Sequence, residues 1–276
     1  MESSKNFTVG SKAYRKRVKT EMHCFYCEAN QVAGEQITIT GSDVNHIKNV
    51  LRMERGEELM VCDGTGMQYT CQIEDFPAGE VKLSVLKAEK ASTELPVRLK
   101  LYQGLPKKDK MELIIQKAVE LGAAEIIPVM TKRCIVKLED DKKEAKKLER
   151  WQAIAESAAK QSGRGIIPKV AKVLNYKEAI KKASEEGMAL IPYEMAEGMK
   201  TLKEAAEKAS SQQVISVFIG PEGGFEETEV EFAKENGVIP VSLGKRILRT
   251  ETAGFTTLSI LMYEIECATE ENEGEV

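Results

Sequence analysis

The feature that most constrains the fold is an alternation of short apolar runs with longer amphipathic segments, which begins near residue 97. Short runs of aliphatic and β-branched residues between polar or glycine-containing stretches predict buried strands. The longer segments repeat apolar residues every three or four positions, which predicts helices with one apolar face. Such alternation is typical of an α/β domain whose helices cover both faces of a parallel sheet. The predicted strands are residues 97–103, 125–130, 188–192, 214–219 and 238–243, and the predicted helices are residues 109–121, 139–161, 176–186, 201–209 and one beginning near 252.

Two glycine-containing loops leave two of these strands. The first is Gly220-Pro221-Glu222-Gly223-Gly224-Phe225, and the second covers residues 244–253. Ligands in α/β proteins bind beyond the carboxyl ends of parallel strands, so the two loops can meet over one site. The first loop lacks both the Gly-Lys-Ser/Thr ending of a phosphate-binding loop and the GxGxxG spacing of a dinucleotide fold. Glu222 would repel phosphate, but it can accept hydrogen bonds from hydroxyl or amine groups or favour a cation; the alternative is a tight turn without a ligand.

Basic side chains gather near the predicted strand ends. Arg246 and Arg249 are three residues apart just before a helix, where Glu251 suits the positive helix end. Either arginine can instead pair with a surface carboxylate. Arg164 follows the helix-ending Gly163 and is either a solvated helix end or a third cation at the site. Further basic groups are Lys107, Lys108 and Lys110, Lys132 with Arg133, and residues 142–150. They fit nucleic acid binding or a solvated helix face, and the solvated face is favoured for residues 142–150.

Residues 22–90 follow a different pattern, in which short β-rich runs are separated by turns. One short helix interrupts them, with Ser42 as its expected cap and with His46, Lys48 and Arg52 on its polar side. The apolar residues Val44, Ile47, Val50 and Leu51 lie at helical spacing. A polar stretch at 91–96 that ends in proline marks the linker. The runs at 35–40, 57–62, 67–73 and 80–86 therefore predict a small β-barrel ahead of the α/β domain.

Composition excludes several classes of protein. The net charge of −4 combines a basic beginning with an acidic end, so it argues neither for nor against a nucleic acid partner. No apolar run approaches the roughly 18 residues of a membrane span. Unevenly spaced cysteines without a secretory signal predict a cytoplasmic protein with reduced thiols.

Cys24 and Cys27 form a lone CxxC pair, whereas structural zinc needs four ligands, so no metal is expected. Residues 1–21 are expected to be a disordered basic tail and residues 269–276 an acidic tail.

Several separated motifs, agreeing in order and spacing between about residues 22 and 266, resemble one family. They are FIGPEGG at 218–224, LGKRILRTETA at 243–253, IIQKAVELG at 114–122, QSGR at 161–164, and in the first part His46, VLRM at 50–53 and Asp63-Gly64. By these motifs the chain is similar to the bacterial small-subunit ribosomal RNA uridine-N3 methyltransferases. That family usually opens on His-Arg-Phe-Phe. Here the stretch is His23-Cys24-Phe25-Tyr26, so one expected RNA contact lacks its arginine.

The resemblance implies a PUA-like RNA-binding barrel over residues 22–92 and a SPOUT-type methyltransferase domain over residues 96–268, with a carboxy-terminal trefoil knot. It also implies a homodimer, S-adenosylmethionine as cofactor and ribosomal RNA of the small (16S) subunit as partner. The residues expected by matching position to hold the cofactor are Tyr193, Ile219, Gly220, Pro221, Glu222, Gly223, Gly224, Leu243, Gly244, Ile247 and Leu248.

The implied reaction is methylation of uridine N3, which must lose its imide proton as the nitrogen attacks the sulfonium methyl. Arg249 is the candidate catalytic residue, because a guanidinium stabilises a developing imide anion. The proton acceptor stays open among Glu222, Glu251 and solvent. The residues expected to contact RNA are His46, Arg52, Lys132, Arg133, Arg164 and Arg246, and the phosphate contacts among them predict salt-dependent binding.

Three other functions fit parts of the same pattern. A non-catalytic RNA-binding assembly factor would keep the fold and fail to bind the cofactor. A methyltransferase acting on the ribose 2′-hydroxyl would place the methyl on the sugar instead of the base. A nucleotide-dependent α/β transferase would bind a nucleotide that S-adenosylmethionine does not displace.

Overall fold

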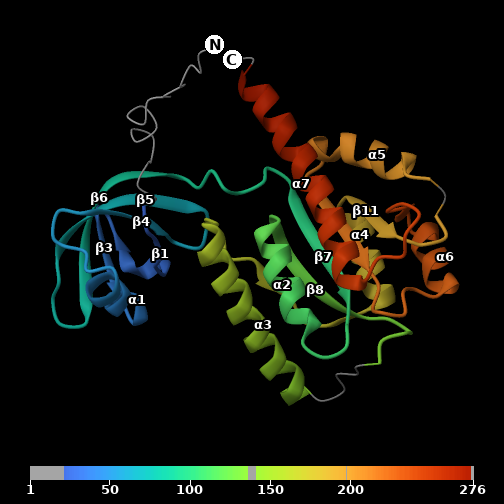
Figure 1. Cartoon of the computed structure of the whole chain (residues 1–276), viewed down its shortest axis with the longest axis horizontal. Coiled ribbons are helices and arrows are strands. Elements are labelled where there is room, and N and C mark those ends of the chain that lie inside the picture. Colours follow the sequence, from blue (N-terminus) through green and yellow to red (C-terminus); the bar gives the residue numbers. More distant parts are fainter. Residues whose placement is uncertain (1–21, 136–140, 197, 275–276) are drawn as a thin grey trace, which may run out of the picture. The chain divides into compact units, whose positions relative to one another are not determined.

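The computed structural model describes residues 22–135, 141–196 and 198–274 (Figure 1). The chain divides into two compact units, and each has a hydrophobic core of its own. The first unit holds the residues up to Cys62 together with Gln68–Glu89, and the second holds Asp63–Met67 and everything from Lys90 onward. The expected basic tail at 1–21 lies outside the described residues, as do residues 275 and 276 of the expected acidic tail.

The first unit is built on a six-stranded sheet in the order β1-β4-β5-β6-β3-β2. In β3 and β4 every second side chain is buried, including Ile37, Ile39, Leu59 and Val61, so the inner face of the sheet forms the core. β1 pairs with β4 in parallel, whereas β4 with β5, β3 with β6 and β2 with β3 are antiparallel. The strands are β1 (Cys24–Tyr26), β2 (Val32–Ala33), β3 (Gln36–Thr40), β4 (Glu58–Cys62), β5 (Met67–Asp75) and β6 (Glu80–Lys90), and a short 3-10 turn at Ala29–Gln31 precedes β2.

The short helix of the first unit forms with two differences from the prediction. It consists of α1 (Ser42–Asn45) and a π-helical turn at His46–Val50. Gly41, and not Ser42, occupies the cap position, and its φ of 76° explains why glycine stands there. Ile47 is fully buried under the sheet, but Val50 is 63% exposed, because the wider π turn rotates it out of the apolar stripe.

The second unit contains the predicted parallel sheet. Its strand order is β10-β8-β7-β12-β11-β13, with β9 paired to β8, and all its recorded pairings are parallel. The three carboxy-terminal strands β12, β11 and β13 are therefore neighbours whose ends lie at one edge. The strands are β7 (Arg98–Gly104), β8 (Ala123–Met130), β9 (Lys169–Val170), β10 (Leu174–Asn175), β11 (Met188–Pro192), β12 (Val214–Ile219) and β13 (Ile239–Val241).

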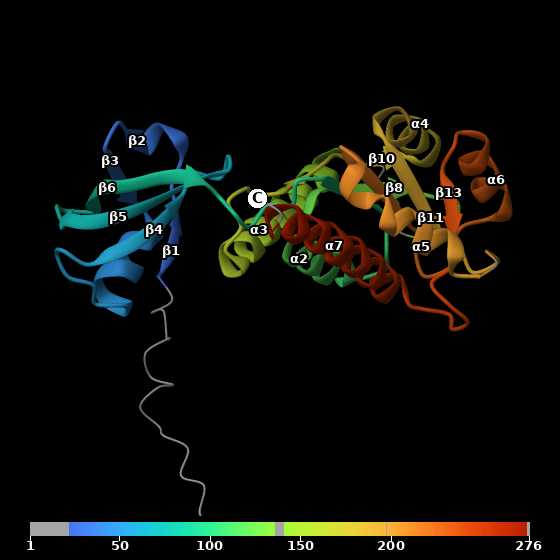
Figure 2. The ribbon, with the colours of Figure 1, turned by 90° about the horizontal axis from the view of Figure 1, so that it is seen from above.

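Helices cover both faces of this sheet, as the alternation in the sequence predicts. Apolar strand residues alternate between two cores: Ile215 and Val217 belong to one, and Phe218 belongs to the other. In Figure 2, α2 and α7 lie on one side of the strands and α4 lies on the other. The first core is covered by α2 (Lys110–Glu120), α3 (Asp141–Ser162), α5 (Lys200–Glu207) and α7 (Thr250–Gly274), and the second by α4 (Tyr176–Glu186) and α6 (Glu227–Glu235).

The structure adds elements that the sequence patterns did not predict. They include the short strands β1, β2, β9 and β10 and the helix α6, whose first turn is closed by a capping box between Glu226 and Glu229. Residues 269–274 of the expected acidic tail continue α7, because glutamate is a good helix former. In the described part of the chain, no helix is both long and apolar enough to cross a membrane. The trefoil knot stays a prediction.

Candidate functional site

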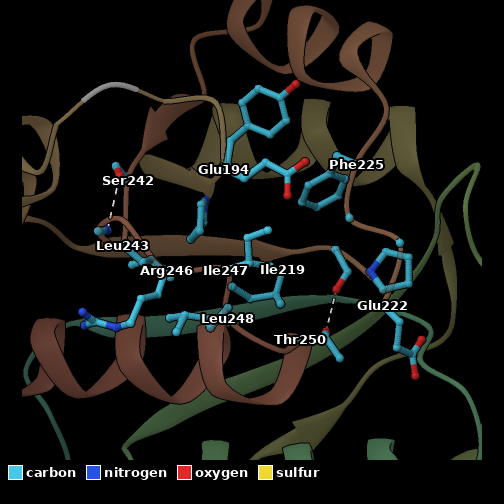
Figure 3. Close-up of a pocket in the computed structure, with 18 residues that line it drawn as sticks. Glu194, Ile219, Glu222, Phe225, Ser242, Leu243, Arg246, Ile247, Leu248 and Thr250 are labelled. Carbon is cyan, nitrogen blue, oxygen red and sulfur yellow. Dashed lines mark hydrogen bonds between the residues drawn. The ribbon is translucent and has the colours of Figure 1, made fainter.

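A cavity of about 180 Å³ opens where β11, β12 and β13 end (Figure 3). Three chain segments form its wall: residues 192–194 after β11, residues 219–225 after β12, and residues 242–248 after β13. Thr250 and Ala253 of α7 complete the lining. Because the strands are parallel neighbours, their carboxyl ends deliver the three loops to the same place. Every residue predicted to hold the cofactor lies in this lining.

The first loop is compact because two of its glycines allow close backbone contacts. A Cβ on Gly220 would lie 3.0 Å from the backbone of Gly224, and Gly224 itself has a φ of 66° that other residues rarely adopt. The N–H of Gly224 donates to the carbonyl of Pro221 at 2.9 Å and closes the turn. At its glycines the loop therefore brings backbone groups, instead of side chains, to the cavity.

Two buried polar side chains fix the start of this loop. The hydroxyl of Thr250 donates to the carbonyl of Gly220 at 2.6 Å, and Gln103 Nε2 donates to the Thr250 oxygen at 2.9 Å. Gln103 also donates to the carbonyl of Gly104 at 2.9 Å. Gln103 is fully buried and Thr250 is 6% exposed, so these hydrogen bonds are shielded from water. They set the direction of the Gly220 carbonyl and join the loop to the start of α7.

Glu222 lines the cavity, but its carboxylate turns away from it. In Figure 3 the carboxylate points away from Phe225, Ile219 and Ile247. It accepts a hydrogen bond from the N–H of Lys107 at 3.1 Å and lies 3.3 Å from the ammonium of Lys110. Burial by itself would raise the pKa of Glu222, but hydrogen bonds from its own N–H and that of Lys107, together with the Lys110 ammonium, hold the pKa below its usual value. Glu222 is thus a charged anchor of the loop.

The two arginines of the second loop occupy different places. Arg246 is part of the cavity lining, whereas Arg249, the predicted catalytic residue, is exposed and outside that lining. The carbonyl of Arg249 accepts the N–H of Ala253 at 2.8 Å, which places Arg249 directly ahead of the first turn of α7. Both side chains belong to the segment that borders the cavity.

Lys132 and Arg133, predicted to contact RNA, lie beside the glycine loop. Arg133 donates to the carbonyl of Gly223 at 2.7 Å from an exposed position after β8. The Lys132 ammonium lies 2.9 Å from the hydroxyl of Thr228 and 3.0 Å from Glu226. These contacts hold two cations at the rim of the loop.

The prediction that Arg164 contacts RNA is wrong. Its side chain is buried, with the residue 4% exposed. It donates to the carbonyls of Ala123 at 2.6 Å and Val119 at 3.1 Å, and it forms an ion pair with Glu94. The negative end of α2 and a carboxylate therefore engage this guanidinium, and Arg164 is a structural residue of the second unit.

His46 and Arg52 form part of an exposed surface on the first unit. His46 packs edge-on against Phe25 with ring centres 5.9 Å apart. Arg52 has a φ of 55°, the left-handed conformation that usually selects glycine at the end of a helix. The N–H of Met53 donates back to the carbonyl of Ile47 at 3.0 Å, which holds Arg52 in this conformation. Backbone strain of this kind concentrates at binding sites.

Comparisons with known proteins agree with this architecture. Residues 93–262 match a family model described as an RNA methyltransferase domain, and residues 39–86 match one described as an RNA methyltransferase PUA domain. The ribosomal RNA small subunit methyltransferase E of Bacillus subtilis is 38% identical over 233 residues, covering 83% of this chain and 90% of that protein. The chain belongs to this RNA methyltransferase family. The protein of the same name from Synechocystis is 34% identical and is covered over 73% of its length.

A solved member of the methyltransferase family has the same fold. The crystal structure of ribosomal RNA small subunit methyltransferase E from Neisseria gonorrhoeae, bound to S-adenosylmethionine, is similar with a TM-score of 0.75 and 34% identity. The match covers 88% of this chain and 97% of that one. The family resemblance, the parallel sheet with helices on both faces and the PUA-like first unit are thereby confirmed.

Sequence reasoning missed four residues that line the methyltransferase cavity: Phe225, Ser242, Thr250 and Ala253. It also missed Gln103, which supports the lining from behind. One signal was available, because Gln103 is an uncharged polar residue near the end of a predicted strand and Thr250 lies between Arg249 and Glu251. Their pairing across 147 positions was not visible in the sequence.

The two cysteines of the CxxC pair have different surroundings in the structure. Cys24 Sγ lies 3.5 Å from Cys62 Sγ, on the neighbouring strand β4, and Cys27 is buried in the core of the first unit. The hydrogen bond to Cys62 lowers the pKa of Cys24 in spite of its burial. In the described residues, no three histidine, cysteine or acidic side chains come together as metal ligands.

Proposed function

We propose that this protein transfers the methyl group of S-adenosylmethionine to N3 of a uridine in small-subunit (16S) ribosomal RNA. The observation that carries the proposal is the cavity at the ends of β11, β12 and β13, because all eleven residues expected to hold the cofactor line it in a chain of this family.

The lining suits S-adenosylmethionine. Ile219, Leu243 and Leu248 offer apolar surface for an adenine ring, and the glycines of both loops let backbone donors and acceptors approach polar groups of the ligand. Gly224 and Gly244 both have positive φ, so side chains are excluded there by conformation. When bound, S-adenosylmethionine supplies an electrophilic methyl group on a sulfonium. The protein's part is to hold that methyl in line with the attacking nitrogen, since orientation alone is worth roughly 7–11 kcal/mol in favourable cases.

Loss of the N3 proton leaves negative charge on the imide, and we assign its stabilisation to Arg249. Its place ahead of α7, beside the second loop, supports this role. Glu222 and Glu251 both contact the ammonium of Lys110, and the lowered pKa of Glu222 makes it a weak base. This arrangement favours solvent as the proton acceptor.

The target base must leave its stack, as bases in single-stranded loops of RNA do. We assign the RNA contacts to His46 and Arg52 on the first unit and to Lys132, Arg133 and Arg246 on the second. The three cations of the second unit lie around the glycine loops, and this supports a role in holding phosphates next to the target base.

The protein acts as a cytoplasmic homodimer in this proposal, with the carboxy-terminal segment threaded as a trefoil knot. Exposed apolar side chains on two helices that pack together support the dimer: Leu113 of α2 is 44% exposed and Tyr263 of α7 is 63% exposed. Exposed apolar side chains on neighbouring helices are suited to contact with a second copy of the chain.

The test is analysis of ribosomal RNA nucleosides from cells with and without the protein. We expect 3-methyluridine to disappear with the protein and to return with the wild type, but not with Arg249→Ala. A methyl found on the ribose, or unchanged nucleosides combined with no binding of S-adenosylmethionine in calorimetry, would support one of the alternative functions. Naked RNA and intact small subunits serve as the two substrates in the matching assay with purified protein.

A further inference from the structure

Lys110 contacts one carboxylate in the loop after β12 and one in the first turn of α7, two of the segments that border the cofactor cavity. Its ammonium lies 3.3 Å from Glu222 Oε1, in the loop after β12, and 3.4 Å from Glu251 Oε2, in the first turn of α7. The two acidic residues are 29 positions apart in the chain, and Lys110 itself comes from the start of α2. Three separate elements therefore meet at one ammonium group.

The charges make this contact more than a surface ion pair. The side chains of Lys110, Glu222 and Glu251 are 32%, 27% and 15% exposed, so solvent screens them only in part. Glu251 Oε2 is buried and, among the described residues, accepts no hydrogen bond. The positive charge of the Lys110 ammonium, 3.4 Å away, therefore offsets the negative charge of this oxygen. Without Lys110, two carboxylates would face each other across the gap, and like charges at such a separation repel.

The backbone around Lys110 is shaped for this position. Lys108, two residues earlier, has a φ of 55°, and the turn presents the N–H of Lys107 to the carboxylate of Glu222 at 3.1 Å. A lysine in the first turn of a helix also opposes the helix dipole, which favours anions there. Two surrounding carboxylates offset that cost. A lysine that follows a strained turn and stands at an unfavourable helix end points to a role beyond solubility.

The other contacts of the loop show what Lys110 controls. Thr250 holds the carbonyl of Gly220, and Arg133 holds the carbonyl of Gly223. Glu222 lies between these two carbonyls in the loop. The Lys110 ammonium that contacts Glu222 also contacts Glu251 at the start of α7. The separation between the glycine loop and α7, which together form one wall of the cavity, thus depends on this shared cation.

We propose that Lys110 is a positioning residue for the cofactor, which holds the glycine loop and the first turn of α7 at the separation that S-adenosylmethionine requires by bridging Glu222 and Glu251. This inference rests on the proposed function. Lys110 does not touch the reacting atoms and acts through the two carboxylates.

The experiment compares Lys110→Met, Lys110→Arg and the double variant Lys110→Met/Glu222→Gln with the wild type. Calorimetry gives the Kd for S-adenosylmethionine, and amide hydrogen exchange of residues 220–225 in the cofactor-free protein gives the mobility of the loop. Lys117→Met is the matched control, because Lys117 lies two turns further along α2 and pairs with Glu120 of the same helix.

We expect Lys110→Met to raise the Kd about tenfold and to speed exchange in the loop, while the KM for RNA stays unchanged. Lys110→Arg should restore most of the affinity. The double variant should bind better than Lys110→Met alone, because removal of one carboxylate relieves the repulsion. Lys117→Met should behave like the wild type.

An unchanged Kd in Lys110→Met, or a double variant weaker than the single one, would overturn the inference. A general loss of folding would show as faster exchange throughout the second unit and no rescue by arginine, and it would also count against a positioning role. Failure of the wild type to bind S-adenosylmethionine would instead remove the proposed function, and the inference with it.

Discussion

At the scale of single residues, the cavity is shaped by side chains that are far apart in the sequence. Gln103 lies near the end of β7, Thr250 begins α7, and both donate to the carbonyl of Gly220. Buried hydrogen bonds of this kind matter mainly because an unpaired buried group is costly. The glycine loop therefore owes its shape to its surroundings as well as to its glycines.

Thr250→Val removes the hydroxyl while keeping the shape of the side chain. The Gly220 carbonyl then loses its 2.6 Å donor and Gln103 loses an acceptor, so we expect the free energy of unfolding to fall by about 1–3 kcal/mol. Urea unfolding measures this loss, and calorimetry should show weaker binding of S-adenosylmethionine. Thr250→Ser is the control, since it keeps the hydroxyl. Equal stability and affinity in the valine and serine variants would contradict this account.

At the scale of elements, the turn after the π-helical segment closes the helix and also presents Arg52, which we assign to RNA binding. The carbonyl of Ile47 and the N–H of Met53 close the helix end around Arg52, and closure of this type ordinarily selects glycine. An arginine at that point accepts backbone strain, which indicates that its charge is needed on the exposed surface.

Arg52→Gly separates these two effects. Glycine adopts the left-handed conformation freely, so we expect the free energy of unfolding to stay equal or to rise by about 1 kcal/mol. Affinity for ribosomal RNA should fall, and the slope of log K against log salt should decrease by about one, because one phosphate contact is lost.

Arg55→Gln is the matched control for Arg52→Gly, because Arg55 is an exposed arginine of the same unit that pairs with Asp75. It should leave RNA affinity and the salt slope close to wild-type values. Unaltered RNA binding by Arg52→Gly would exclude Arg52 from the RNA contacts.

At the scale of the whole molecule, the exposed apolar side chains of α2 and α7 predict association of two chains. Leu113→Asp/Tyr263→Asp should convert a dimer into a monomer with little change in the stability of each chain, because both side chains are already exposed. Sedimentation equilibrium measures the mass over a range of concentrations. Val50→Asp, an exposed apolar position on the first unit, is the control and should remain a dimer. A wild type that sediments as a single chain would refute the dimer.

The helices and strands of the second unit and their arrangement in layers follow from the order of residues along the chain. Strands β7, β8, β11, β12 and β13 and helices α2 to α5 lie within a few residues of their predicted ranges, because apolar periodicity is a local property that each element needs in order to be buried. The loops that form the cavity were predictable for the same reason, since each directly follows a buried strand. Helix α6 was missed, because its capping box uses Glu226 where serine or threonine is the usual signal.

Which charged side chains stabilise the fold and which face the site became visible only once the chain was folded. Arg164 and Arg133 look alike in the sequence, yet Arg164 meets carbonyls 41 and 45 positions away in the interior, and Arg133 stays exposed beside Gly223. The role of Lys110 likewise follows from its ion pairs with Glu222 and Glu251, which belong to other parts of the chain. Burial and charge pairing depend on contacts between distant segments, so local patterns do not contain them.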